Sequence, residues 1–123
     1  MKIAFASTDA KSVNEHFGRC ETFYLYECTK TGYSFITVSE APEEKATESD
    51  KLHYKIKCLQ GADLVCMTQI GPKASTLVKS AGIFPMKASF EGQGIKEILQ
   101  KLQALMQSAM PPLWLRQIMT KEP

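Results

Sequence analysis

The stretch ADLVCMTQIGPKAS, residues 62–75, contains the pattern on which the prediction of the fold depends. Residues 62–67 form a short, mostly apolar run, which is typical of a strand buried on both faces of a sheet. Gly71 and Pro72 follow, and proline is favoured at the first position of a helix because its missing N–H is not needed there. We therefore expect a strand over residues 62–67 and a helix from Pro72 to about Ser80, which together make one β–α unit.

Four further segments are predicted to be strands. Residues 2–7 form a second short apolar run. Residues 22–28 and 33–40 are rich in aromatic and β-branched side chains and flank a short polar turn, which predicts an antiparallel hairpin. Residues 83–89 form the last strand, and its proline predicts a place at the edge of the sheet.

Short, right-handed connections favour one arrangement of these five strands. Numbered along the chain, they should lie in the order 3-2-1-4-5, with the first strand beside the fourth. The parallel strands read as continuously apolar, so helices should cover both faces of the sheet. The predicted fold class is α/β with a five-stranded mixed sheet.

Two other helices are expected. Residues 41–50 are acidic and are interpreted as a solvated loop, in which Thr47 and Asp50 have capping-box spacing for a helix that ends at Gly61. The C-terminal helix has the clearest amphipathic pattern, and Pro111 and Pro112 should end it. Six of its apolar residues share one predicted face: Ile95, Ile98, Leu99, Leu102, Leu105 and Met106.

The 123 residues fit one α/β domain, residues 1–110, followed by a C-terminal tail, residues 111–123. The apolar side chains of the tail either pack back onto the domain or dock onto a partner protein.

The composition excludes several classes of protein. The chain is 44% hydrophobic and has a net charge of +2, without the dense basic stripe of a nucleic-acid binder. No secretory leader or membrane span is recognised, so we expect a cytoplasmic protein that does not bind membranes. Its four cysteines form no C-x-x-C pair, which argues against zinc ribbons and thioredoxin-type redox enzymes. Cys28, Cys58 and Cys66 are interpreted as packing residues.

The strand order predicts the position of a site. In open α/β sheets, ligands bind beyond the carboxyl ends of the strands where the winding direction changes, here between the first and fourth strands. Two loops leave that point, residues 8–19 and the segment after residue 67. We expect them to form an electropositive cleft that receives an anionic, metal-containing ligand beside a helix N-terminus. The side chains and glycines brought together there would be His16, Gly18, Arg19, Gly71 and Lys73.

At these residues the sequence resembles a known family. The opening strand followed by STDAKSVNEHFGRCETFYLYE, residues 7–27, is similar to the dinitrogenase iron–molybdenum cofactor-binding family of the NifX and NafY type. The likeness continues through TQIGPKAS, residues 68–75, and the C-terminal helix, and PPLWLRQ, residues 111–117, is closest to the ending of NifX members. The resemblance implies a ribonuclease H-like fold and a carrier, not an enzyme. Such a carrier would transiently bind the iron–sulfur precursor of the nitrogenase cofactor (NifB-co type), or the finished cofactor, and exchange it with the assembly scaffold and related biosynthesis proteins.

His16 and Cys20 are the candidate metal ligands. The resemblance implicates the histidine of HFG in cluster binding, and imidazole and thiolate both bind iron in iron–sulfur centres. Arg19 is expected to lower the pKa of the Cys20 thiol; the alternative is that Cys20 is a small buried side chain. Gly18 is expected to allow the turn that orients the imidazole. Arg19 and Lys73 either offset the charge of a sulfide-rich cluster or are solvated cations. Asp9 is expected to cap or brace the loop, and Phe17 either shields the cleft from water or anchors the loop to the core.

So few candidate ligands predict a site that holds a preformed cluster weakly enough to release it. Two alternatives remain open at this point. A ribonuclease H-like nuclease is disfavoured because the first and fourth strands lack the converging carboxylates that bind paired metals. An accessory protein that acts through protein contacts without a cluster is compatible with the sequence.

Overall fold

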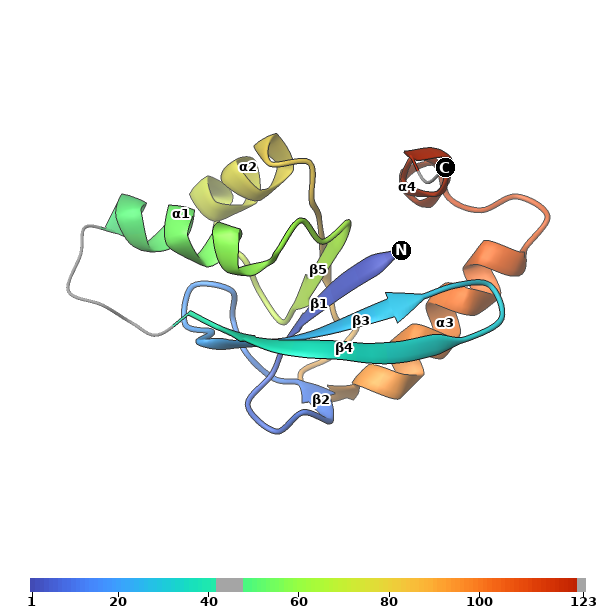
Figure 1. Ribbon diagram of the computed structural model, residues 1–123, viewed down its shortest axis with the longest axis horizontal. Helices are drawn as coiled ribbons and strands as arrows, with labels where there is room; N and C mark the ends of the chain where they lie inside the picture. The colour runs from blue at the N-terminus through green and yellow to red at the C-terminus, as the bar shows by residue number, and fades with distance from the viewer. Residues whose placement is uncertain (42–47, 122–123) are drawn as a thin grey trace.

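The computed structural model describes residues 1–41 and 48–121 as a mixed sheet with helices packed against it (Figure 1). Five strands form the sheet in the order β4-β3-β1-β5-β6. Their bounds are β1 Lys2–Ala6, β3 Thr22–Cys28, β4 Tyr33–Glu40, β5 Leu64–Met67 and β6 Phe84–Lys87. The helices are α1 Glu48–Cys58, α2 Pro72–Ser80, α3 Ile95–Gln107 and α4 Leu113–Lys121.

Strand β1 lies between the two neighbours expected for it. It pairs antiparallel with β3, where Phe5 is opposite Tyr24, and parallel with β5, where Phe5 is opposite Cys66. The hairpin of β3 and β4 is also as predicted. Strand β6 is at the edge of the sheet, where Pro85 removes no hydrogen bond from a central ladder.

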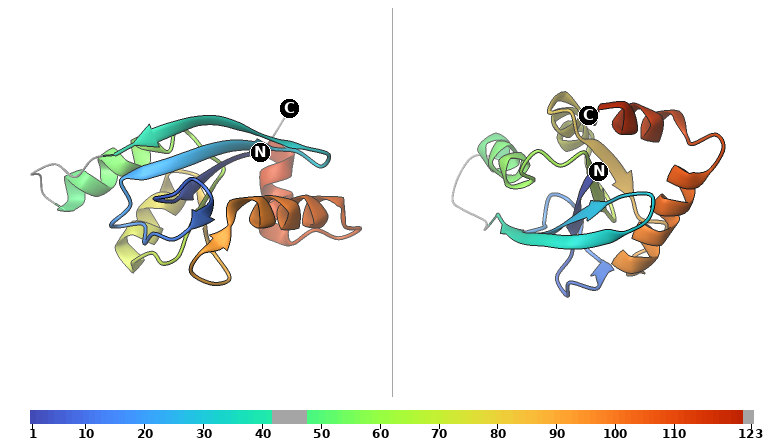
Figure 2. Two further views of the ribbon diagram at one scale, coloured as in Figure 1. Left: turned by 90° about the horizontal axis from the view of Figure 1, so that it is seen from below. Right: turned by 45° about the vertical axis from the view of Figure 1, so that its right-hand side comes forward.

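The two faces of the sheet are covered by different helices, as Figure 2 shows. Alternation along β1 directs Ile3 and Phe5 into a core with α3 and α4, and Ala4 and Ala6 into a second core. The second core contains residues from α1, α2 and the loop that follows β1. The predicted placement of helices on both faces is therefore confirmed.

Glycines at the ends of two helices have the left-handed backbone expected of them. Gly61 has φ +70° after α1, and Gly82 has φ +82° after α2. Helix α1 ends at Cys58, three residues before Gly61. The capping box proposed for Thr47 and Asp50, and most of the acidic loop, lie outside the described residues.

Three sequence-based expectations need correction. A two-stranded ladder of β2 Ser12–Val13 and β7 Gln93–Gly94 lies partly within the segment predicted to be a loop. Leu105 was expected on the buried face of α3 but is 37% exposed, because it lies at the margin of the apolar stripe. Residues 113–121 form helix α4, whose Leu115 and Ile118 are buried in the core with α3. The helix was not predicted, whereas packing against the domain was one of the two alternatives for the tail and is observed.

In the part of the chain that the structure describes, no helix has both the length and the apolar character needed to cross a membrane.

Candidate functional site

The two loops predicted to meet at the ends of β1 and β5 are joined by backbone hydrogen bonds. Phe17 N–H donates to the carbonyl of Gln69 at 2.8 Å, and Thr68 N–H donates to the carbonyl of Glu15 at 3.0 Å. His16 is half-buried and lies between these two tied residues. The backbone of His16 is therefore fixed beside the segment that leads into Gly71.

The chain turns sharply after His16. The His16 carbonyl accepts hydrogen bonds from the N–H groups of Arg19 and Cys20, at 3.2 and 3.0 Å. The Phe17 side chain is fully buried and packs against Phe23, with 5.8 Å between the ring centroids. The prediction that Phe17 anchors the loop is confirmed. We refer to residues 16–20 as the HFG turn.

Lys55, a residue that was not predicted to belong to the site, supports the HFG turn. Lys55 on α1 is 8% exposed, and its Nζ donates to the carbonyls of Phe17 and Gly18 at 3.0 and 2.8 Å. The ammonium also lies 5.7 Å from the centre of the Phe17 ring, within the range of a cation–π contact. The sequence did contain a signal for this residue. Position 55 lies on the same helical face as Leu52 and Leu59, where an apolar residue is expected, but it is a lysine.

Asp9 braces the start of the loop, as predicted. Its Oδ1 accepts hydrogen bonds from the N–H groups of Lys11 and Ser12, at 2.9 and 2.8 Å, and the hydroxyl of Ser7 donates to it at 3.1 Å. Because the backbone donors at Lys11 and Ser12 favour the carboxylate, they lower the pKa of Asp9 to about 2. A tight turn with Ala10 at φ +65° results.

The structure does not support Cys20 as an exposed metal ligand. Its side chain is fully buried in the core with α1 and α2, and its Sγ donates to the carbonyl of Thr22 at 2.9 Å. Burial raises the pKa of the thiol to about 11, so the expectation that Arg19 lowers it is wrong. A metal could reach this sulfur only if the side chain left the core.

The remaining predicted residues are exposed. Gly18 does not have positive φ, and a Cβ added to it would meet no atom within 4 Å, so the HFG turn does not require glycine for its conformation. Arg19 and Lys73 are exposed cations on the two loops. Gly71 precedes α2, and Pro72 takes the first position of that helix, as expected.

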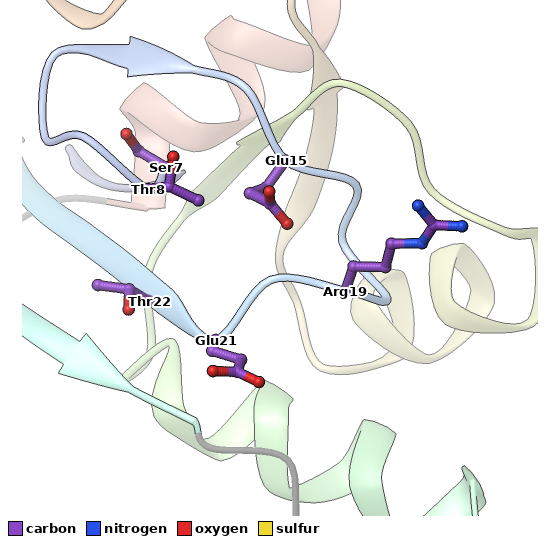
Figure 3. A pocket seen from close by; sticks show the side chains of 6 residues that line it. All are labelled: Ser7, Thr8, Glu15, Arg19, Glu21 and Thr22. Atoms are coloured by element: carbon purple, nitrogen blue, oxygen red, sulfur yellow. The ribbon is translucent and has the colours of Figure 1, made fainter.

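A depression of about 290 Å³ lies between the end of β1 and the start of β3 (Figure 3). Its lining carries two carboxylates and one guanidinium, so it is not the electropositive cleft that we expected. The lining residues are Ser7, Thr8, Glu15, Arg19, Glu21 and Thr22.

Metal-binding clusters and nuclease carboxylates are both missing from the described residues. Within residues 1–41 and 48–121, no three His, Cys, Asp or Glu side chains come together as a metal site. Asp63 accepts a hydrogen bond from Lys2 N–H at 2.9 Å, at the opposite end of β1 from the loop junction. The site therefore resembles neither a resident metal centre nor the paired-metal site of a nuclease.

Comparison with known proteins identifies the family. A profile described as dinitrogenase iron-molybdenum cofactor matches residues 1–105. The chain belongs to the dinitrogenase iron-molybdenum cofactor family. The family match spans both loops of the junction and all five strands of the sheet, and it confirms the resemblance seen in the sequence.

Comparison with individual proteins agrees with this assignment. Protein NifX of Azotobacter vinelandii is 34% identical over 116 residues, which are 94% of this chain and 72% of that protein. The FeMo cofactor biosynthesis protein NifB of Sinorhizobium fredii is 30% identical over 86 residues, 68% of this chain but 17% of that protein. The crystal structure of PH0822 superposes with a TM-score of 0.66 at 26% identity, covering 85% of this chain and 89% of that one.

Proposed function

We propose that this protein is a non-enzymatic carrier in the biosynthesis of the nitrogenase cofactor. Its cargo would be the iron–sulfur precursor cluster or the finished iron–molybdenum cofactor, bound transiently and then released. The observation that supports this most is the family match over residues 1–105, which includes His16 and the loops tied together on either side of it. The order of the strands is also compatible with a ribonuclease H-like fold, which we propose for this chain on the basis of its family.

His16 is the proposed protein ligand of the cargo. Neutral imidazole binds iron, and histidine replaces cysteine in some iron–sulfur centres. The exposed cations Arg19 and Lys73 would offset the negative charge of a sulfide-rich cage. Gly18 and Gly71 leave space for a bulky cargo to approach the backbone. With one side-chain ligand in place of about four, the cargo would be held weakly enough to pass on.

The proposed partners are the scaffold on which the cofactor is assembled and related biosynthesis proteins. Similarity to part of a NifB protein and to NifX proteins supports this general kind of partner. The competing function is an accessory protein that acts through protein contacts without any cluster, and the absence of a three-ligand site among the described residues is what favours it.

Anaerobic titration with the isolated precursor cluster separates the two functions. The wild-type protein should take up the cluster and acquire its visible charge-transfer absorbance. His16→Ala should weaken uptake about tenfold or more, as is usual when a metal site loses an important group. His53→Ala is the matched control, because His53 is the second histidine of the chain and lies exposed on α1.

Two results would contradict the carrier proposal. If the wild-type protein takes up no cluster, the accessory function is favoured. If His16→Ala and wild type bind the cluster equally, the site is elsewhere.

A further inference from the structure

Lys55 is a buried cation placed directly beneath the HFG turn. Its side chain is buried, and its ammonium lies 3.0 and 2.8 Å from two consecutive carbonyl oxygens, those of Phe17 and Gly18. Both bonds join segments that are far apart in the sequence. The lysine therefore joins the turn to helix α1 and not merely to neighbouring residues.

A lysine in this position has an energetic cost. Removing an ammonium from water is unfavourable unless hydrogen bonds compensate for it, and the neighbours of position 55 on the helical face include the buried Leu52 and Leu59. A leucine or methionine would fill the same space without that cost. Among the contacts of the lysine are two charge-assisted hydrogen bonds, the stronger kind of hydrogen bond in proteins, which are donated to the HFG turn.

We propose that Lys55 is a positioning residue that holds His16 in the geometry required for cargo binding; this inference rests on the proposed function. The Phe17 N–H is tied to Gln69, its ring is buried, and its carbonyl is bound by Lys55. The residue after His16 is thus fixed by three separate contacts. Gly18 has open space around it and no side chain of its own to hold it, so the ammonium at its carbonyl restrains the outer part of the turn.

Lys55→Met tests this role because methionine keeps a long apolar side chain and loses the donors. Amide hydrogen exchange in the free protein should accelerate about tenfold or more at Arg19 and Cys20, since a hydrogen bond to a charged group contributes at least that factor. Release of the precursor cluster from the loaded protein should accelerate by a similar factor. Lys55→Arg, which keeps the charge and offers two donors, should restore most of both properties.

Lys57→Met is the matched control, because it removes an exposed lysine from the same helix. It should change neither amide hydrogen exchange nor the release of the cluster. Lys55→Gln keeps a donor nitrogen but loses the charge; it should give an intermediate result, and it decides the question if Lys55→Met does not fold.

A purely structural role for Lys55 is distinguished by combining substitutions. If Lys55 acts through His16, then Lys55→Met should have little further effect on cluster release in a His16→Ala background; additive effects would overturn the proposal. Wild-type exchange rates at Arg19 and Cys20 in Lys55→Met would also overturn it.

If wild-type protein takes up no cluster, the carrier function fails, and the role of Lys55 in cargo binding fails with it. If the wild-type protein binds the cluster through His16, but Lys55→Met releases the cluster at the wild-type rate, only the inference about Lys55 fails.

Discussion

Two candidate ligands that are four residues apart, His16 and Cys20, lie in different surroundings. His16 is half-buried at the loop junction, whereas Cys20 points into the core beneath α1 and α2. The sequence shows the two residue types and their spacing but not the direction in which the chain turns between them. That direction is set by the anchoring of Phe17, which is a tertiary contact.

The thiols provide a direct check of this difference. In native protein at pH 8, Cys58 should react first with a disulfide reagent, because it alone of the four cysteines is partly exposed. A pKa of about 11 leaves Cys20 with about a hundredfold less thiolate than the ordinary value of 9.0 would. Cys20, Cys28 and Cys66 should therefore react only in denaturant.

The experiment is a time course of labelling followed by peptide mass spectrometry, with Cys58→Ser as the control that removes the fast phase. Rapid labelling of Cys20 in folded protein would show that its burial is incorrect and would restore it as a candidate ligand.

Asp9 predicts a pH dependence of stability. Its pKa is lowered from 3.8 to about 2 in the folded protein, chiefly by the backbone N–H groups of Lys11 and Ser12. Its stabilising contribution should be fully present above about pH 4 and should be lost as the pH falls toward 2. Urea unfolding between pH 2 and 6 should show a difference between wild type and Asp9→Asn that shrinks as the pH falls. A difference that stays constant with pH would contradict this assignment.

At the scale of single elements, the strands and most helices follow from local pattern. Pro72 and Gly82 mark the ends of α2 as expected, and Pro85 marks an edge strand. Helix α4 was missed because Pro111 and Pro112 were interpreted only as residues that end α3. A proline also suits the first turn of a helix, and the carbonyl of Pro112 accepts a hydrogen bond from Arg116 N–H at 3.0 Å at the start of α4.

Two leucines of α4 should respond differently to truncation. Leu115 is fully buried against the core with α3, so Leu115→Ala should reduce the free energy of unfolding by about 2–5 kcal/mol. Leu113 is 61% exposed, so Leu113→Ala should change it by less than about 0.5 kcal/mol. Chemical denaturation of both variants measures this. Equal, small effects would indicate that α4 does not pack on the domain in solution.

At the scale of the whole molecule, the neighbours of β1 were predictable because one connection is a hairpin and the other is a right-handed crossover. The pairing of β2 with β7 was not predictable, since each of these strands has only two residues and so carries no pattern of its own. The loop junction followed from the strand order. The negative charge near the loop junction was not predicted, because the sequence does not show that Glu15 and Glu21 line the same depression.

The hydrogen bonds of Glu15 and Phe17 to Thr68 and Gln69 have a mechanical consequence for a carrier. In the proposed carrier, they would make the grip on the cargo depend on the two loops staying joined, so a short peptide containing His16 would lack it. A recipient protein could then trigger unloading by separating the two loops that follow β1 and β5, without competing for the imidazole itself. Handover would be controlled by deformation of the carrier, and its rate would depend on how readily the hydrogen bonds between these two loops break.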